Sequence, residues 1–369
     1  MPLIVEGGRI PPRWVLEGHC RPVVPCDIGR PAHVNIAFIN NMPDAALEDT
    51  ELQFFDLLDD ASGDLLIYLK LYSLTGIPRT DRGQRHLNSF YYSLDELWEN
   101  QFDGVIVTGT EPRQPNLQDE PYWKVLAEVF DWAERNTVSA VLSCLAAHAS
   151  VLHGDGIGRH RLPDKQFGVF NFTKTASHPL TSSIEDGVRF SHSRWNEVQA
   201  KALTDCGYAV LTQSADAGVD TFVKKRKQSL FVHFQGHPEY GAETLLKEYR
   251  RDVRRFLKGE RETYPTMPKG YFDAAGEKLA ADFRDAVLGQ QPCDRREELM
   301  ENFPDRVLAR TLQRTWYSCA TEMYRNWLHY VISGKASVAM SSPVTAISEN
   351  VPSERRALPQ RQKRGTCRK

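Results

Sequence analysis

The stretch Val138-Ser-Ala-Val-Leu-Ser-Cys144-Leu-Ala-Ala-His-Ala149 decides the fold of this chain. Its apolar run from Ser139 to Leu142 has the length and character of a buried strand. Small residues follow Cys144, so the chain can turn sharply into a helix at that point. We therefore predict that Cys144 lies at the carboxyl edge of a parallel sheet, directly before a helix.

A cysteine at such a turn has the surroundings of a nucleophile. The unpaired N–H groups and the positive dipole end of the following helix stabilise negative charge and offer an oxyanion site. The competing interpretation is a buried structural cysteine, because free cysteine is among the most buried residue types. The partners of Cys144 further along the chain decide between the two.

Strands and helices alternate on the N-terminal side of this stretch. Apolar runs and helical spacing predict, in chain order, strand 33–39, helix 48–58, strand 65–72, helix 94–98, strand 104–109 and helix 120–136. This β-α-β order favours a mostly parallel sheet that is covered by helices on both faces. The predicted fold class is therefore α/β.

The rest of the chain contains shorter strands and then helices. Strand-like runs within 166–235 are expected to extend the sheet with mixed directions, and helices are predicted over 242–258, 277–288 and 305–333. The final segment is rich in charged and small residues, which favours disorder. The predicted organisation is an N-terminal arm (1–30), a catalytic α/β domain (31–270), a C-terminal helical extension (271–335) and a disordered tail (336–369).

Composition excludes several classes of protein. The 46 basic and 48 acidic residues nearly balance, so no global field favours nucleic acid or a membrane surface as a partner. No apolar run approaches the roughly 20 residues needed to span a bilayer, and the N-terminus lacks a signal-peptide pattern. We expect a cytoplasmic enzyme that acts on small molecules.

Metal and cofactor motifs are likewise missing from the sequence. The seven cysteines are scattered and form no CxxC pair, which excludes a zinc knuckle and a disulfide framework. There is neither a dinucleotide-binding glycine fingerprint nor a P-loop. The basic run Lys224-Lys-Arg-Lys227 indicates a solvated hairpin tip or, alternatively, a contact to nucleotide phosphate. We expect no metal and no bound cofactor.

The segment Leu230-Phe-Val-His-Phe-Gln-Gly-His237-Pro-Glu239-Tyr240 supplies partners for Cys144. A strand ends at the glycine, and residues two apart in extended backbone point the same way. Glu239 can therefore reach one nitrogen of His237 while the other nitrogen faces a nucleophile, as in a catalytic triad. His148, one helical turn past Cys144, is an alternative base.

An elbow cysteine followed by His-Pro-Glu resembles two families with the flavodoxin-like, class I glutamine amidotransferase-like fold. One is the glutamine amidotransferases, which usually carry glycines where this chain has Leu142 and Ala146. The other is the homoserine O-succinyltransferase family, including its acetyl-transferring members. An ordered set of motifs across roughly 33–334 favours this second family: Asn41-Met-Pro43, Asp49-Thr-Glu-Leu-Gln53, Thr108-Gly109, Pro121-Tyr-Trp123, Lys165-Gln-Phe-Gly-Val-Phe170, His192-Ser-Arg194, Gly236-His-Pro-Glu-Tyr240, Arg251-Asp-Val253 and Asn326-Trp-Leu328.

The resemblance implies a role for each of these positions. Cys144 would take the acyl group from acyl-CoA as a thioester, with His237 as general base and Glu239 orienting it. The N–H of Leu145 would be one oxyanion donor. Acyl-CoA would be a co-substrate, and a homodimer is expected. Three residues would contact substrate: Lys165, Ser193 and Arg251.

The chain also departs from the family pattern. The lysine that follows Met-Pro in the family is missing after Met42-Pro43, and the elbow reads Cys144-Leu-Ala-Ala-His148. The position that helps choose the acyl group falls on Arg113, or on Glu111 if the turn is shifted. Arg113 could pair with a succinyl carboxylate, whereas Glu111 would repel it and favour acetyl.

The resemblance predicts an acyl-CoA-dependent homoserine O-acyltransferase with a ping-pong mechanism in methionine or related sulfur amino-acid synthesis. Serine or another hydroxy amino acid is an alternative acceptor. A glutamine amidotransferase-like hydrolase with the same triad is a second alternative. A non-catalytic module that keeps the fold is a third.

Overall fold

The computed structural model describes residues 3–6, 13, 32–185, 187–290 and 297–341. Within these residues, an eight-stranded sheet has the order β1-β3-β2-β4-β5-β12-β11-β8. The first six strands in this order run parallel, and β11 and β8 are antiparallel to their neighbours. The strands are β1 Leu3–Val5, β2 His33–Ile39, β3 Leu66–Tyr72, β4 Gly104–Val107, β5 Ser139–Ser143, β8 Ala209–Val210, β11 Thr221–Arg226 and β12 Ser229–Phe234.

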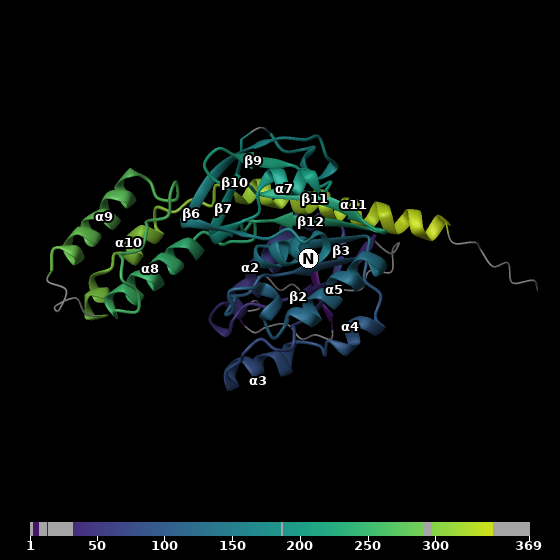
Figure 1. The fold of residues 1–369 in the computed structure, drawn as a ribbon, viewed down its shortest axis with the longest axis horizontal. Coiled ribbons are helices and arrows are strands. Elements are labelled where there is room, and N and C mark those ends of the chain that lie inside the picture. Colours follow the sequence, from purple (N-terminus) through teal and green to yellow (C-terminus); the bar gives the residue numbers. More distant parts are fainter. Residues whose placement is uncertain (1–2, 7–12, 14–31, 186, 291–296, 342–369) are drawn as a thin grey trace, which may run out of the picture.

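Helices cover both faces of this sheet (Figure 1). Helices are needed on both faces because alternate residues of β5 are apolar on both. Val141 packs into the core under α2 and α11, whereas Ala140 and Leu142 pack into the core under α5 and α6. The predicted α/β class with a mostly parallel sheet is confirmed. The helices are α2 Asp44–Ser62, α3 Asp81–Phe90, α4 Asp95–Glu99, α5 Trp123–Asn136, α6 Leu145–Asp155, α7 Ala200–Asp205, α8 Thr244–Leu257, α9 Ala274–Leu288, α10 Asp305–Ala309 and α11 Tyr317–Ser341.

The strands predicted within 166–235 do not all join the main sheet. The two predicted runs that begin at Phe167 and Val188 instead lie in a second, antiparallel sheet, which two short strands complete. Its strands are β6 His160–Lys174, β7 Val188–Glu197, β9 Thr212–Ser214 and β10 Gly218–Val219. Phe170, Phe172 and Phe190 of this sheet pack into the core that contains α2 and α11. The expectation of one extended sheet was wrong here, because β6 and β7 bury their aromatic face by packing onto the main sheet.

Helices α8, α9 and α10 form a lobe that extends away from the sheets (Figure 1). Its core includes Tyr249, Phe272, Leu308 and Trp316. The single helix predicted over 305–333 is two helices, α10 and α11. The chain breaks between them because it crosses from the lobe core at Trp316 to the main core, which Ala320 enters.

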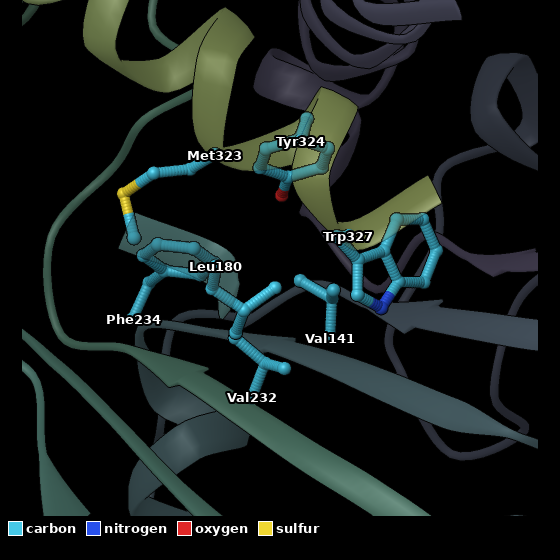
Figure 2. A pocket seen from close by; sticks show the side chains of 7 residues that line it. All are labelled: Val141, Leu180, Val232, Phe234, Met323, Tyr324 and Trp327. Atoms are coloured by element: carbon cyan, nitrogen blue, oxygen red, sulfur yellow. The ribbon is translucent and has the colours of Figure 1, made fainter. Parts of the chain in front are cut away.

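Helix α11 returns to the sheet and lies on β5 and β12 (Figures 1 and 2). The indole N–H of Trp327 donates to Ser139 Oγ at 2.9 Å, at the start of the strand that leads to Cys144. Figure 2 shows an apolar gap between helix and sheet that is too narrow to admit water. It is lined by Val141, Leu180, Val232, Phe234, Met323, Tyr324 and Trp327.

The predicted terminal segments lie partly outside the described residues. Within the predicted arm, Leu3–Val5 adds an edge strand beside β3, and 14–31 are outside the description. Helix α11 continues to Ser341, past the predicted start of the tail at 336, and 342–369 are outside the description. The segment 271–335 contains α9, α10 and most of α11, and its status as a separate extension of the domain 31–270 stays a prediction.

Candidate active site

Cys144 forms the predicted elbow between β5 and α6. Its backbone has φ 53° and ψ −111°, a left-handed conformation that a non-glycine residue adopts only under constraint. Its N–H donates to the Phe234 carbonyl oxygen at 2.8 Å, and its carbonyl oxygen accepts from the N–H of Ala147 at 3.1 Å. These bonds hold the turn, and the cysteine is partly exposed. Strained elbows of this kind present a nucleophile at the edge of a sheet.

His237 and Glu239 lie beside the elbow, after the end of β12. His237 Nδ1 lies 2.8 Å from Glu239 Oε1, and the charge of Cys144 acts on the His237 ring. The His237 backbone is fixed by Ser191, whose carbonyl oxygen accepts from the His237 N–H and whose hydroxyl donates to the His237 carbonyl oxygen. His237 is 7% exposed and Glu239 is 3% exposed. The structure therefore brings the three predicted triad residues together.

The electrostatics favour a charged His237. Burial by itself lowers the pKa of the imidazole, but the charges of Cys144 and Glu239 and hydrogen bonds to both raise it well above its usual value. The arrangement therefore favours the imidazolium form of His237. An imidazolium beside a cysteine stabilises a thiolate and is ready to give up a proton.

The surroundings of Glu239 lock the acid in place. Its carbonyl oxygen accepts from the Arg314 guanidinium at 3.3 Å, and the Tyr240 ring stacks on the His237 ring with centroids 4.2 Å apart. Its second carboxylate oxygen is buried and has no hydrogen-bond partner among the described residues. Glu239 thus directs one oxygen at His237 and leaves the other unsatisfied.

Gly236 allows the segment before His237 to pass through a tight space. A Cβ atom there would lie 2.7 Å from the Ser191 carbonyl oxygen and 2.8 Å from both Asp220 Oδ1 and His192 Nε2. The Gly236 N–H donates to Asp220 Oδ1 at 2.8 Å. Any larger residue would displace the backbone that positions His237.

The predicted oxyanion donor, the N–H of Leu145, is free of intrahelical hydrogen bonds. Leu145 is the first residue of α6, so its N–H has no acceptor within the helix. The turn after β4 passes close by, because a Cβ on Gly109 would lie 3.0 Å from the Leu145 nitrogen. A glycine at 109 therefore keeps the space above this N–H free for an oxygen atom.

The alternative base, His148, is not placed to act on Cys144. His148 Nε2 hydrogen-bonds with Gln235 Oε1 at 2.9 Å, and the side chain is buried. Burial lowers its pKa to about 3, so it stays neutral. His148 is a structural histidine that joins α6 to the end of β12.

The three predicted substrate-binding residues converge on Glu248 of α8, which the sequence analysis did not identify. Glu248 Oε2 lies 3.1 Å from Lys165 Nζ, accepts from the Ser193 hydroxyl at 2.5 Å, and lies 3.7 Å from an Arg251 nitrogen. Its other oxygen accepts from the Tyr240 hydroxyl at 2.7 Å. Since Tyr240 stacks on His237, this cluster adjoins the triad.

Glu248 is an anion in this environment. Burial raises the pKa of its carboxyl group. The charge of Lys165 and the hydrogen bonds from Ser193 and Tyr240 lower this pKa by more, so it lies below its usual value. The Arg251 side chain is 52% exposed and also hydrogen-bonds with Asp252. The cluster thus offers a partly buried anion, a partly buried lysine and an exposed guanidinium, which suits a zwitterionic ligand.

The turn with the predicted acyl-specificity residues is held by Glu120. The N–H groups of Arg113 and Gln114 donate to Glu120 Oε1 at 2.5 and 2.6 Å. The side chains of Glu111 and Arg113 are exposed. The turn follows β4, which neighbours β5, so it lies on the same edge as Cys144.

A different cation lies where the sequence lacks the family lysine. The Arg79 guanidinium donates to the Met42 carbonyl oxygen at 2.6 Å and pairs with Asp44 at 3.1 Å. Arg79 follows β3 and comes from elsewhere in the chain. It therefore fixes the Met42-Pro43 turn.

The basic run 224–227 forms ion pairs with acidic residues of the same chain. Lys224 and Arg226 pair with Asp155 at 2.6 and 2.5 Å, and Lys227 pairs with Glu134. The turn after Arg226 lies at the amino edge of the sheet, because Leu230 pairs with Ser139 at the start of β5. The run lies at the hairpin between β11 and β12, on the edge opposite Cys144, but Lys224 and Arg226 are ion-paired and partly buried, not solvated as predicted.

The described part of the chain shows neither a metal-binding cluster nor a membrane-spanning helix. No group of three or more His, Cys, Asp or Glu side chains is arranged there to hold a metal ion. No helix there has the length and apolar character to cross a bilayer.

Comparison with known families identifies the relatives of this chain. The family model for homoserine O-succinyltransferase matches residues 28–338. The chain belongs to the homoserine O-succinyltransferase family, a family of acyltransferases. A homoserine O-succinyltransferase of Rhodopseudomonas palustris is 41% identical over 313 residues, which cover 85% of this chain and 92% of the relative. One from Bradyrhizobium japonicum is 40% identical over 305 residues, with 82% and 92% covered.

The similarity between this chain and solved structures is weaker than its similarity to the sequence relatives. A glutamine amidotransferase of Thermotoga maritima superposes with a TM-score of 0.44 at 12% identity, covering 81% of this chain and 98% of that one. One from Methylobacillus flagellatus gives 0.43 at 12% identity, with 81% and 95% covered. The fold description therefore rests on the strand order given above.

Proposed function

We propose that the chain is an acyl-CoA-dependent homoserine O-acyltransferase that carries the acyl group on Cys144 in a ping-pong mechanism. The observation that carries the proposal is the position of Cys144 at a strained elbow on the carboxyl edge of the sheet, beside a His237 that is hydrogen-bonded to Glu239. Membership in the homoserine O-succinyltransferase family supports it. The reaction would serve methionine or related sulfur amino-acid synthesis.

In the first half-reaction, Cys144 accepts the acyl group. Its thiolate attacks the thioester carbonyl carbon of acyl-CoA, and the N–H of Leu145 stabilises the resulting oxyanion. The bond between the carbonyl carbon and the CoA sulfur then breaks. His237, held as an imidazolium, gives its proton to the departing CoA thiolate. The product is a thioester on Cys144 and a neutral His237.

In the second half-reaction, the acceptor hydroxyl takes the acyl group. Neutral His237 removes the hydroxyl proton while the oxygen attacks the thioester carbonyl carbon on Cys144. The carbon–sulfur bond breaks, and Cys144 leaves as a thiolate beside the restored imidazolium. Glu239 orients His237 and stabilises its charge in both halves.

The cluster around Glu248 would bind the amino-acid end of homoserine. The Glu248 carboxylate and the Ser193 hydroxyl suit an ammonium group, and the planar fork of Arg251 suits a carboxylate. Lys165 balances the charge of Glu248. The contact from Glu248 through Tyr240 to His237 would place the acceptor hydroxyl near the base.

Succinyl-CoA is the donor to test first, because the relatives are named as succinyltransferases. Acetyl-CoA remains the alternative donor, with Arg113 or Glu111 as the predicted specificity position. Serine remains the alternative acceptor. A homodimer and a cytoplasmic location remain predictions.

Mass spectrometry of the intact protein tests the proposal directly. The enzyme is mixed with succinyl-CoA or acetyl-CoA without acceptor, and the acyl adduct is then challenged with homoserine or serine. We expect a succinyl adduct that is missing in Cys144→Ala and is discharged by homoserine. A matched control is Cys206→Ala, which should keep the adduct.

Other outcomes would redirect or remove the proposal. Discharge by serine alone would change the acceptor. A folded enzyme that forms no adduct with either donor would rule out acyl transfer through Cys144, and hydrolysis of glutamine would then be measured.

A further inference from the structure

A buried carboxylate next to the segment that leads to His237 has no role in the acyl transfer described above. Asp220 lies between β10 and β11, and its side chain is fully buried. Its Oδ1 accepts from the Gly236 N–H at 2.8 Å, and its Oδ2 accepts from the Thr221 hydroxyl at 2.7 Å. Burying a carboxylate is unfavourable, whereas an apolar residue fills a core position without that cost. The charge at this position therefore needs an explanation.

Asp220 belongs to a row of contacts that hold three consecutive residues after the end of β12. The Gln235 N–H donates to the Asp220 carbonyl oxygen at 3.1 Å, and the Gly236 N–H donates to the Asp220 carboxylate. The His237 N–H donates to the Ser191 carbonyl oxygen at 2.8 Å. Each acceptor lies outside β12, on β7 or directly before β11. The backbone position of His237 therefore depends on these neighbouring elements.

His192 and Arg194 of β7 support the carboxylate of Asp220. His192 Nε2 lies 3.3 Å from Asp220 Oδ1, in poor alignment for a hydrogen bond, and both side chains are fully buried. The Arg194 Nε–H donates to His192 Nδ1 at 3.2 Å, so the proton of a neutral imidazole lies on Nε2, next to the carboxylate. Burial lowers the pKa of His192 well below its usual value, which keeps the ring neutral. Arg194 also donates to the carbonyl oxygens of Asn196 and Ala217, which fix its guanidinium.

Asp220 is ionised near neutral pH. Burial raises the pKa of its carboxyl group to about 6. The hydrogen bonds from Thr221 and Gly236 act in the opposite direction. The positive charges of Arg194 and His237 also lower it. At pH 7 the group is therefore mostly a carboxylate, which can accept hydrogen bonds at both oxygens.

We propose that Asp220 is a positioning residue: through the Gly236 N–H, its carboxylate keeps His237 beside the nucleophile. The inference rests on the proposed acyl transfer and adds a residue on which the placement of the base depends. The histidine and the arginine behind the carboxylate act only on the carboxylate. A hydrogen bond to an ionised acceptor is roughly twice as strong as a neutral one, which suits a contact that fixes the backbone next to a base.

Two substitutions at Asp220 test whether the acceptor matters. Asp220→Ala frees the Gly236 N–H, so we expect kcat to fall by about 30- to 100-fold and KM to change by less than about threefold, because a base displaced by about 1 Å transfers protons poorly. Asp220→Asn keeps an oxygen acceptor in a side chain of the same shape and should stay within about fivefold of wild type. The measurement is steady-state kinetics with succinyl-CoA and homoserine.

A second measurement reads the influence of His237 on Cys144 without acyl-CoA. The rate at which iodoacetamide alkylates Cys144, followed on its peptide by mass spectrometry, reports the thiolate at each pH. In Asp220→Ala the acid limb of this profile should move to higher pH by about one unit, because a displaced imidazolium stabilises the thiolate less. A loss of stability alone would leave the profile of the folded enzyme unchanged.

Asp103 provides the matched control. Its Oδ2 accepts from the Asn35 N–H at 2.8 Å and pairs with Lys335. Asp103 lies directly before β4, at the edge of the sheet opposite Cys144, because the start of β4 pairs with the start of β5. Asp103→Ala therefore also frees a backbone N–H. It should lower stability and leave both the kinetics and the alkylation profile of Cys144 unchanged.

The outcomes separate this inference from the proposed function. An unmoved alkylation profile in folded Asp220→Ala overturns the inference, as does an equal shift in Asp103→Ala. Asp220→Asn that is as slow as Asp220→Ala overturns the role of the acceptor. A wild-type enzyme that accepts no acyl group defeats the proposed function instead, and the alkylation profile then decides alone.

A folding defect in Asp220→Ala is met by a second variant. Asp220→Val fills the space, removes the buried charge and suits the start of a strand, and it should show the same shift of the alkylation profile. Failure of both variants to fold would show that the carboxylate maintains the fold rather than the base, and would overturn the inference.

Discussion

The two ends of helix α6 differ in how their reactive or charged side chains are paired. At its first turn, the partly exposed Cys144 lies beside the buried His237, and the second oxygen of Glu239 has no hydrogen-bond partner among the described residues. At its last turn, the Asp155 carboxylate is paired with both Lys224 and Arg226. The last turn thus holds its anion in two ion pairs, whereas the first turn presents a sulfur that solvent can reach beside a base held by an acid. A reachable nucleophile with an oriented base, rather than charge density, therefore marks the candidate active site.

The largest expected effect comes from the acid of the triad. Glu239→Gln removes a charge that raises the pKa of His237, so the pKa of His237 should fall. We expect kcat/KM to drop by about 10³- to 10⁴-fold, and the alkaline limb of its pH profile to move to lower pH. The measurement is a pH–rate profile of both enzymes. A lower rate with an unmoved alkaline limb would show that Glu239 acts only through packing.

A smaller effect is expected next to the triad, at Glu248. Glu248→Gln keeps the shape of the side chain but removes the carboxylate that pairs with Lys165 and accepts from Ser193. The KM for homoserine should rise by about 10- to 100-fold, while acylation of Cys144 without acceptor stays within a few-fold. Steady-state kinetics and the acylation assay separate the two steps. Glu243→Gln, at the exposed start of the same helix, is the control. Equal damage to acylation would contradict an acceptor-binding role.

The smallest effect on activity is expected at the far end of α6. Asp155→Asn should leave kcat/KM unchanged and lower the free energy of unfolding by about 1–3 kcal/mol, because Lys224 and Arg226 lose their anion. Folding lowers the pKa of Asp155, so its contribution is present above its unfolded value of 3.8 and is lost as pH falls through the folded value. Chemical denaturation should show a smaller difference in the free energy of unfolding between wild type and Asp155→Asn at pH 3 than at pH 7. Lost activity at pH 7 would break the contrast between the two ends.

The sequence predicts most of the parallel sheet because its strands are apolar on both faces. The run Ser139–Ser143 is fully buried and could be identified from composition alone. Helix α3 was missed for the opposite reason: its apolar side consists of Leu87 and Phe90 beside the buried Gly83, which is too short a stripe to stand out in the sequence. The second sheet was missed because a short apolar run does not reveal which sheet it joins.

The candidate site was predicted where motifs are local and missed where contacts are distant. His237 and Glu239 are two residues apart, so their contact follows from extended backbone. Glu248 lies in the charged run Glu248-Tyr-Arg-Arg-Asp252, and its partners come from other elements. One signal was present: Glu248 and Asp252 fall on the side of α8 that also carries Leu245 and Tyr249. Acidic residues on a buried stripe need partners and are worth testing.

The return of α11 to the sheet has a consequence for biosynthesis. One face of the sheet, including Val141 and Val232, is covered by Met323, Tyr324 and Trp327, which are made long after the strands (Figure 2). While the ribosome is still producing the helical lobe, α2 and the second sheet can pack on this face, but the part that α11 covers stays open. Nascent chains that expose apolar surface are prone to aggregate. Truncations that remove α11 should therefore need chaperones to stay dispersed, even though every triad residue has already been synthesised.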